Sequence, residues 1–297
     1  MRKVLYTAMT GGHDDILQPS IIADGFDYIL FTNDIPEQQL GIWRVRHIPY
    51  DNKDPRRVAR WVKTHPHILL PDYDYSLWHD SNVVVDSQAY FERIDDLIKT
   101  NVLIASMDHN VRSCIYEEGF AVLNYRFDSI DNVLGEMYYL KKEGYPTNNG
   151  LIETNCLLRK HTDVNVANMC DDWWRMIEKY SKRDQLSFNY VVWKNDLKIK
   201  LILPERMNAR NHSYIHCISH KNGTPEEVKA VWYIVSTMFV EKSLPLYKEF
   251  VESRSKGLTL WLLKERVRII CIYYIYLLTW KYFVGTKVKM GIKRFVK

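Results

Sequence analysis

Residues 75–85 read YSLWHDSNVVV, a short apolar strand that breaks at Asp80-Ser81-Asn82 and resumes as three valines. Other β-branched and aromatic runs that end in turn residues are found along the chain at 3–9, 27–32, 43–48, 103–107 and 151–159. Helical segments alternate with these runs, among them 56–63, 165–180 and 184–193. This alternation predicts an α/β fold with a mostly parallel sheet, in which ligands bind beyond the carboxyl ends of the strands.

The composition is that of a globular protein with a substantial core, since 46% of the 297 residues are hydrophobic and 26% are charged. We expect one large domain over residues 1–242 and a helical, aromatic and basic tail over residues 243–297. Five dispersed cysteines without a CxxC pair favour neither a disulfide framework nor a structural zinc site. The first residues also lack the apolar stretch of a secretion signal, so we expect a cytoplasmic protein.

Charge is distributed unevenly along the chain. Residues 258–297 contain nine lysines and arginines and one glutamate, and they therefore carry +8, whereas the whole chain carries +5. The remaining residues, 1–257, are weakly acidic. A weakly acidic body argues against a nucleic-acid-binding domain, which would present a basic face on the folded core.

The longest uncharged apolar run lies in the tail, where residues 269–280 read IICIYYIYLLTW. Twelve helical residues extend over only ~18 Å, which is short of the ~30 Å hydrocarbon core of a bilayer. An aromatic helix with a lysine-rich end is instead typical of an anionic membrane interface. A helix packed on the body is an equally open alternative.

Two features of the body suggest a site for a phosphorylated ligand. Asp80 and Asn82 offer oxygen ligands one residue apart, a donor set that suits Mg²⁺ or Mn²⁺ when phosphate oxygens and water complete the shell. Arg56, Arg60 and Lys63 share one helix face and suit a diphosphate. The alternatives are a common turn for the first feature and a solvated helix face for the second.

Two further segments carry polar groups near predicted strand or helix ends. The strand at Tyr6-Thr7-Ala8 runs into Gly11-Gly12, whose backbone can approach a nucleotide base and ribose, although the GxGxxG fingerprint is absent. Asp184 and Gln185 open a helix, whose dipole keeps a carboxylate ionised. A plain turn and a helix cap are the respective alternatives. His216 and the later Lys221 are candidates for metal or phosphate contact, with a surface position as the alternative.

These segments together resemble the glycosyltransferase-like domain once catalogued as domain of unknown function six-one-six, found in plant mucilage-related proteins and bacterial polysaccharide clusters. The resemblance runs from about Val4 to Trp193 and implies a GT-A-like fold with a layout similar to glycogenin-like enzymes. It rests on Tyr6-Thr7-Ala8 with Gly11-Gly12, Arg57-x-Ala59-Arg60-x-x-Lys63, Tyr75-Ser76-x-Trp78-x-Asp80-x-Asn82, Ser113-Cys114-x-Tyr116-x-Glu118, Glu153-Thr154, Arg159-x-His161-Thr162 and Arg183-Asp184-Gln185-Leu186-Ser187-Phe188-x-Tyr190.

The resemblance implies transfer of a sugar from a nucleoside diphosphate donor, with UDP-sugars favoured, to a hydroxyl of a polysaccharide or a lipid-linked oligosaccharide. A divalent cation, Mn²⁺ or Mg²⁺, and basic side chains would neutralise the leaving diphosphate. Asp184 would deprotonate the acceptor if the reaction inverts the anomeric centre, and with Gln185 it would hold a sugar if the reaction retains it. The implied donor site comprises Tyr6, Thr7, Ala8, Arg57, Arg60, Lys63, Asp80, Ser81 and Lys221, and the implied metal ligands are Asp80, Asn82 and His216.

Two departures from the glycogenin-like pattern keep a second function open. Asn82 stands where that pattern has a second aspartate, and Ser219 stands where a glycine follows the late histidine. A catalytically silent GT-A-fold protein that binds a glycan or a partner is therefore the alternative. A lipid or sugar hydrolase has little support, because the sequence contains neither Gly-x-Ser-x-Gly nor HExxH. A lipid-linked acceptor would place the enzyme peripherally at the inner face of the membrane, held there by the basic tail.

Overall fold

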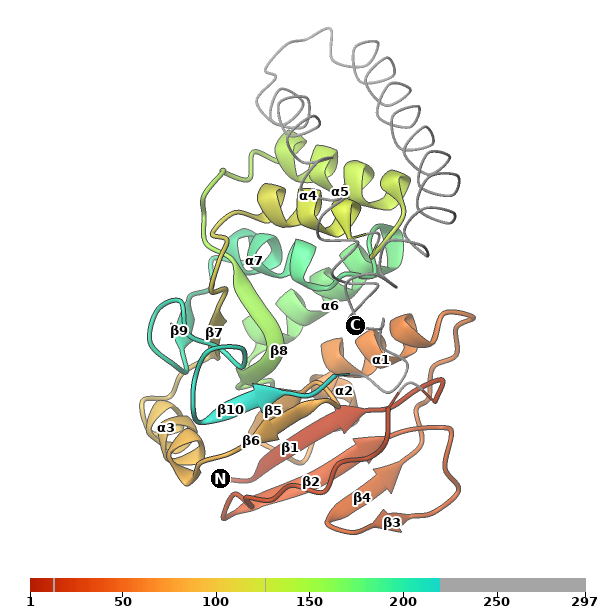
Figure 1. Ribbon diagram of the computed structural model, residues 1–297, viewed down its shortest axis with the longest axis vertical. Helices are drawn as coiled ribbons and strands as arrows, with labels where there is room; N and C mark the ends of the chain where they lie inside the picture. Colours follow the sequence, from red (N-terminus) through yellow and green to blue (C-terminus); the bar gives the residue numbers. More distant parts are fainter. Residues whose placement is uncertain (13, 126, 220–297) are drawn as a thin grey trace, which may run out of the picture. The chain divides into compact units, whose positions relative to one another are not determined.

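The computed structural model describes residues 1–12, 14–125 and 127–219. Within these residues an eight-stranded sheet forms the centre of the fold, and a two-stranded sheet lies beside it (Figure 1). The strands of the large sheet are β1 (Lys3–Ala8), β2 (Phe26–Phe31), β3 (Gln39–Leu40), β4 (Trp43–Arg46), β5 (Tyr75–His79), β7 (Ile104–Asp108), β8 (Ile152–Arg159) and β9 (Ile199–Leu201). The small sheet consists of β6 (Val83–Val85) and β10 (Ile215–Cys217).

The large sheet has the order β3-β4-β2-β1-β5-β8-β7-β9 and is parallel except for β3 and β8. The expected GT-A-like layout, a mixed and mostly parallel sheet flanked by helices, is confirmed. The central strands β1, β2 and β5 are parallel neighbours, so their carboxyl ends meet at one edge. The expected helical tail and the expected domain boundary at residue 242 lie outside the described residues.

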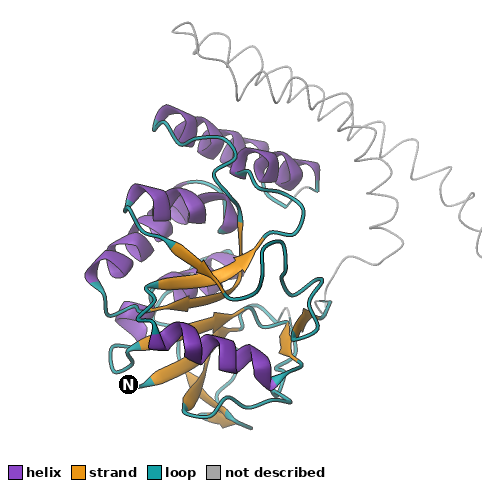
Figure 2. Cartoon of the chain, turned by 90° about the vertical axis from the view of Figure 1, so that its left-hand side faces the viewer, coloured by secondary structure: helices purple, strands orange, loops and turns teal. Residues whose placement is uncertain are grey.

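Helices pack on both sides of this sheet (Figure 2). They are α1 (Pro55–Thr64), α2 (Pro66–Leu69), α3 (Gln88–Lys99), α4 (Ile115–Asn124), α5 (Ile130–Lys142), α6 (Val164–Lys179) and α7 (Gln185–Lys194). On one side α1 packs on β1 and α6, and α6 packs on α7. On the other side apolar residues of α3 and β10 join the core residues of β1, β2 and β5.

Local sequence explains where α1 begins, which matters because this helix carries Arg60 and Lys63. Asp54 accepts a hydrogen bond from the Arg56 backbone N–H, and Pro55 occupies the first helical position. The missing N–H of a proline costs nothing there, because the first amides of a helix have no helical partner. Arg60 and Lys63, three residues apart, therefore lie near one another on a single helix face, as predicted.

The turn at residues 80–82 takes the chain out of the large sheet. β5 ends at His79, and the valines that follow form β6, which pairs antiparallel with β10 and does not pair with the large sheet. The Asp80 N–H donates to the Asn155 carbonyl of β8 at 2.8 Å, which fixes the turn at the end of the sheet. The break that the sequence predicts is thus a change of sheet.

Candidate functional site

Two carboxylates share two cations at the carboxyl end of β5. Asp184 Oδ1 lies 3.0 Å from Arg60 Nε, and Asp184 Oδ2 lies 2.5 Å from Lys63 Nζ. Asp80 Oδ1 lies 3.4 Å from Arg60 Nη1 and 3.4 Å from Lys63 Nζ. We call these four side chains the Asp80–Asp184 centre. The structure thus brings together four of the residues that the sequence analysis singled out.

Asp80 is the most accessible carboxylate of this centre. Its side chain is 25% exposed, whereas that of Asp184 is 5% exposed. The indole N–H of Trp78 donates to Asp80 Oδ1 at 2.7 Å, so this oxygen is fully engaged. Asp80 Oδ2 has no hydrogen-bond partner within the described part of the chain. One oxygen therefore anchors the side chain and the other is available to a ligand.

Asp184 is held as an anion. Burial alone would raise the pKa of its carboxyl group, but Arg60 and Lys63 outweigh burial and hold that pKa well below its usual range. Thr154 also donates to Asp184 Oδ2, at 2.9 Å. A strongly acidic carboxylate with both oxygens occupied is a poor proton acceptor. The geometry thus supports a holding role for Asp184 and argues against the general-base role expected for an inverting reaction.

Helix α7 starts at this centre without the side-chain cap that was the alternative for Asp184. Asp184 occupies the N-cap position, but its carboxylate accepts no cap bond from the helix backbone. Gln185 donates to the Ile152 carbonyl at 2.9 Å, and Asn189 accepts from the Ile152 N–H at 3.0 Å. The first turns of α7 therefore fix the beginning of β8, and Gln185 is largely buried there.

Arg57 lies outside the centre, contrary to its assignment to the donor site. Its guanidinium donates to the Ile177 carbonyl, to the Glu178 carbonyl at 3.3 Å and to the Tyr180 carbonyl at 3.0 Å. These carbonyls belong to the end of α6, where unpaired C=O groups and the helix dipole attract a cation. Arg57 is therefore a C-terminal cap of α6.

Tyr6 is also structural. Its side chain is fully buried, its hydroxyl donates to the Lys63 carbonyl at 3.0 Å, and its ring packs edge-on against Trp78. The buried guanidinium of Arg159 donates both to the Tyr6 hydroxyl and to the Lys63 carbonyl. Tyr6 and Arg159 thus fix the last turn of α1 and thereby the position of Lys63. A contact between the Tyr6 side chain and a nucleotide, as assigned from the sequence, does not fit this position.

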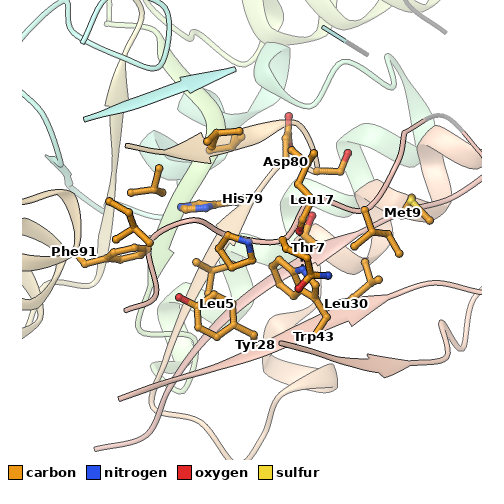
Figure 3. Close-up of a pocket in the computed structure, with 18 residues that line it drawn as sticks. Leu5, Thr7, Met9, Leu17, Tyr28, Leu30, Trp43, His79, Asp80 and Phe91 are labelled. Atoms are coloured by element: carbon orange, nitrogen blue, oxygen red, sulfur yellow. Dashed lines mark hydrogen bonds between the residues drawn. The ribbon is translucent and has the colours of Figure 1, made fainter. Parts of the chain in front are cut away.

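A largely apolar cavity of about 50 Å³ lies beside the centre (Figure 3). Thr7 lines it, and the Thr7 hydroxyl is buried without a hydrogen-bond partner in the described part of the chain. Asp80 and Ser81 contribute to the same lining, so the cavity reaches the centre. The remaining lining is mostly apolar and includes Leu5, Met9, Leu17, Tyr28, Leu30 and Trp43. Ala8 is buried at the end of β1 and is not part of this lining.

The other predicted ligand residues lie around the β6–β10 pair. Ser81 donates to Asp14 at 2.6 Å, and Asn82 donates its amide N–H to the Ile218 carbonyl at 2.8 Å. His216 pairs with Val84 in the ladder, and its Nδ1 lies 2.6 Å from Asp86 Oδ2. His216 lies opposite Val84, and Val84 is two residues after Asn82. Because alternate residues share a strand face, His216 emerges on the same face as Asn82.

Nothing in the described residues forms a ready-made metal centre: no group of three or more His, Cys, Asp and Glu side chains among them is arranged to hold a metal ion. Lys221, the remaining predicted donor-site residue, lies outside the described residues.

The sequence analysis missed several residues that position the centre. From β8, Thr154 contacts Asp184 and Asn155 contacts Asp80. Trp78 holds Asp80, and Arg159 holds the end of α1. Thr154, Trp78 and Arg159 belong to the segments that carry the family resemblance. The contact of Trp78 with Asp80 is local, since the two residues are only two positions apart. Nothing in the spacing of Thr154 and Arg159 shows their partners, because the pairing of β8 with β5 brings them to this place.

Comparisons with known proteins agree with this picture. The profile of the TOD1/MUCI70 glycosyltransferase-like domain matches residues 28–216. "Probable hexosyltransferase MUCI70" of Arabidopsis thaliana is 29% identical over an alignment of 169 residues that covers 52% of this chain. This chain spans 28% of that relative's length.

Two solved structures also match part of this chain. Mouse xyloside xylosyltransferase 1, in its apo form, is 7% identical with a TM-score of 0.44, covering 75% of this chain and 99% of that one. Core-mannan synthase A of Aspergillus fumigatus, in a Mn/GDP form, is 9% identical with a TM-score of 0.41, covering 68% and 72%. On the match over residues 28–216, the chain belongs to the TOD1/MUCI70 glycosyltransferase-like domain family.

Proposed function

We propose that this chain is a glycosyltransferase that moves a hexose from a nucleoside diphosphate donor to a hydroxyl of a polysaccharide or of a lipid-linked oligosaccharide. A UDP-sugar is the favoured donor. The observation that carries the proposal is the Asp80–Asp184 centre, where two carboxylates share Arg60 and Lys63 at the carboxyl end of β5. Membership of the family and the relative named a hexosyltransferase support the same reaction class.

The centre has the charges that departure of a diphosphate requires. Negative charge grows on the leaving group during glycosyl transfer, and fixed cations in a water-poor site stabilise it. Arg60 is partly accessible, while Lys63 is fully buried behind it. Asp184 holds both cations in place, so no side chain needs to reorganise during the reaction. In this proposal Arg60 contacts the diphosphate and Lys63 contributes through its fixed charge.

The donor set around Asp80 fits a divalent cation. Asp80 Oδ2 and the side-chain oxygen Oδ1 of Asn82 are hard oxygen donors without partners in the described part of the chain. Asp86 engages His216 Nδ1, the arrangement that leaves the other ring nitrogen of a ligating histidine facing a metal. Asp80, Asn82 and His216 would hold Mn²⁺ or Mg²⁺, which would neutralise diphosphate oxygens as a Lewis acid.

The cavity lined by Thr7 supports binding of the nucleoside part of the donor. The mostly apolar lining suits the face of a base. The proposed donor site also includes the backbone at Ala8 and at Gly11-Gly12, which come shortly after Thr7 in the chain. Ser81, which also lines the cavity, is placed between nucleoside and diphosphate.

Asn82 keeps the catalytically silent alternative in view. Its amide N–H closes the β6–β10 pair by donating to Ile218. An aspartate, the residue of the glycogenin-like pattern, has no N–H to donate there. The observed bond therefore gives Asn82 a structural use, which suits a glycan- or partner-binding protein that retains the fold without transferring sugar.

We further propose that the enzyme works peripherally at the inner face of the cytoplasmic membrane, through the basic tail at 243–297. That tail lies outside the described residues, and within the described residues no helix is long and apolar enough to cross a bilayer. Co-sedimentation of the full chain with phosphatidylglycerol vesicles, compared with phosphatidylcholine vesicles, tests this proposal. Equal recovery with both would contradict an electrostatic membrane contact.

Nucleotide binding is the first test of the reaction class. We expect UDP with Mn²⁺ to raise the melting temperature of the full chain more than GDP, CDP or dTDP, because a ligand of the folded state alone stabilises it. Asp80→Asn should abolish this shift, and Asp72→Asn, which removes an exposed carboxylate away from the centre, should preserve it. Absence of a shift with all four nucleotides, with and without Mn²⁺, would favour the silent binding protein.

A further inference from the structure

A second polar cluster lies next to the Asp80–Asp184 centre and has no part in the proposal above. It consists of His109, Arg112, Glu118, Glu153 and Arg210, which come from the segments after β7 and β9, from α4 and from β8. Arg112 Nε donates to Glu118 Oε2 at 2.6 Å, and Arg210 donates to Glu153 Oε1. We call this group the Glu118–Glu153 pair with its flanking cations.

Three consecutive residues of β8 connect this pair to the centre. Glu153 contacts Arg210 and His109, Thr154 donates to Asp184 at 2.9 Å, and the Asn155 carbonyl accepts from the Asp80 N–H at 2.8 Å. Since consecutive Cα atoms are about 3.8 Å apart, the Glu153 backbone lies within about 8 Å of the Asn155 backbone. Burial raises the pKa of the Cys217 thiol, and both Asp80 and Glu153 raise it further, so the two carboxylates lie near one and the same thiol.

Alternation along β8 explains why neighbouring residues serve two sites. Consecutive residues of a strand face opposite sides, so Thr154 reaches Asp184 while Glu153 reaches the other cluster. The sheet is also irregular here: the register between β7 and β8 shifts at Ser106/Met107, and the Ser106 hydroxyl contacts the carbonyl oxygens of both Glu153 and Cys156.

Two carboxylate oxygens of this cluster are unused. Among the described residues neither Glu153 Oε2 nor Glu118 Oε1 has a hydrogen-bond partner. Both side chains are nevertheless about 95% buried. Neither oxygen is sealed from solvent. An unbonded carboxylate oxygen in a buried side chain is costly unless a ligand or water completes its hydrogen bonds.

The charge balance of the cluster determines what kind of ligand fits. The pKa of His109 is lowered to about 4 by burial and by Arg112 and Arg210, so its imidazole is neutral. Its Nδ1 accepts from the backbone N–H groups of Val111 and Arg112, while its Nε2 lies 3.3 Å from Arg112 Nη2 and 3.5 Å from Glu153 Oε1. Arg112, Arg210 and the nearby Arg183, which also acts electrostatically on Glu153, compensate the two carboxylates, so the cluster has no excess negative charge to attract a cation. It offers acceptors to an uncharged donor, and the hydroxyl groups of a sugar are such donors.

We propose that Glu153 and Glu118 form a sugar-hydroxyl subsite of the transferase, with Glu153 Oε2 and Glu118 Oε1 accepting hydrogen bonds from a sugar held beside Asp80. This inference deepens the proposed function and rests on it. The sugar is either the hexose of the donor or the sugar of the acceptor, because both present the same hydroxyl chemistry. Arg112 and Arg210 orient the two carboxylates.

The donor arm of the test uses isothermal titration of the full chain with UDP and UDP-glucose. Glu153→Gln preserves shape but removes the charge, and Glu92→Gln on the exposed face of α3 is the matched control. If the subsite holds the donor hexose, Glu153→Gln lowers the affinity for UDP-glucose at least tenfold and leaves the affinity for UDP unchanged. Titration of UDP-galactose, GDP-mannose and dTDP-glucose against their parent nucleotides extends the arm to other donors.

The acceptor arm measures transfer to octyl glycosides of glucose, galactose and mannose. If the subsite holds the acceptor, Glu153→Gln raises the acceptor KM at least tenfold, while donor affinity and hydrolysis of the donor by water stay unchanged. Glu118→Gln should act in the same arm, and it carries the test if Glu153→Gln does not fold. Glutamine variants that match Glu92→Gln in both arms overturn the subsite alone, whereas a native chain that binds no nucleotide overturns the proposed function itself.

Discussion

Lys63 and Asp184 form a buried ion pair in which Nζ lies 2.5 Å from Oδ2, and this pair joins α1 to the start of α7 across 121 positions of sequence. Lys63 has no exposed surface, and burial lowers its pKa while Asp184 and Asp80 act in the opposite direction. The charge on Lys63 therefore depends on its two carboxylate partners. Several expected outcomes depend on this arrangement.

Removing the Asp184 charge should destabilise the fold strongly. In Asp184→Asn the Lys63 ammonium keeps only Asp80, at 3.4 Å, as a charged partner, and breaking a buried pair from one side costs about 3–5 kcal/mol. We expect a loss of this size in the free energy of unfolding measured by urea titration. The double variant Asp184→Asn with Lys63→Met should recover part of it, because no buried cation is left uncompensated. Equal stabilities for the single and double variants would contradict the pair's role.

Arg57 and Arg60 should respond in opposite ways although they are three positions apart in α1. Arg57→Met removes the cap of α6 and should lower the free energy of unfolding by about 1–2 kcal/mol while UDP affinity stays within twofold. Arg60→Met should lower UDP affinity more than tenfold, since Arg60 faces Asp80. Urea titration and calorimetric titration of both variants give the comparison. A tenfold loss of UDP affinity in Arg57→Met would return Arg57 to the donor site.

These two arginines also show how far the sequence can predict the site. The spacing of α1 predicts that Arg60 and Lys63 share a face, and the apolar run before Asp80 predicts a strand end, because both follow from local geometry. Which neighbour each face meets depends on tertiary packing, so Arg57 was assigned to the wrong partner. The same holds for Tyr6 and Thr7, which point to opposite sides of β1: alternation predicts two faces but not which one borders a cavity.

Pairings across long separations were beyond the sequence. β10 pairs with β6 across more than 120 residues, and each strand has only three residues, too few for a recognisable alternation. The helix α3 was missed as well, although Ser87 caps it and its apolar positions recur with helical spacing. The irregularity between β7 and β8 beside Glu153 has no signal in residue types, since it arises from the register of the two strands.

Stability should fall as the pH is lowered from 6.5 toward 4. Among the described residues burial lowers the pKa of five imidazoles, to about 4 in His65, His109 and His161, to about 3 in His79, and also in His67. Between the lowered pKa values and 6.5 the unfolded chain binds more protons than the fold does, so these groups make the fold less stable as the pH falls. Glu136 and Glu153, whose pKa is raised by burial, act in the opposite direction over part of this window, but the five histidines outnumber them.

Urea midpoints between pH 7 and pH 4.5 check this expectation. His161→Gln keeps a donor for the Leu70 carbonyl and removes one titrating group, so it should reduce the slope of stability against pH. His47→Gln, at an exposed position, should leave the slope unchanged. A slope that is the same in His161→Gln and in the native chain would mean that this imidazole is already protonated in the fold.

Asn82→Asp distinguishes an enzyme that uses a metal from a silent binding protein. The carboxylate cannot donate to the Ile218 carbonyl, so without metal we expect a loss of about 1 kcal/mol and a lower melting temperature. If Asp80 and residue 82 hold a divalent cation, the added charge strengthens that site, and Mn²⁺ should raise the melting temperature of the variant more than that of the native chain. Mg²⁺ should act in the same direction.

The control for this experiment is Asn82→Ala, which also loses the bond to Ile218 but gains no ligand. It should show the same destabilisation without metal and no added response to Mn²⁺. A variant Asn82→Asp that responds to Mn²⁺ no more than Asn82→Ala would mean that residue 82 contributes to strand pairing alone. Transfer would then depend on Arg60 and Lys63 for its positive charge, or the chain would bind sugar without transferring it.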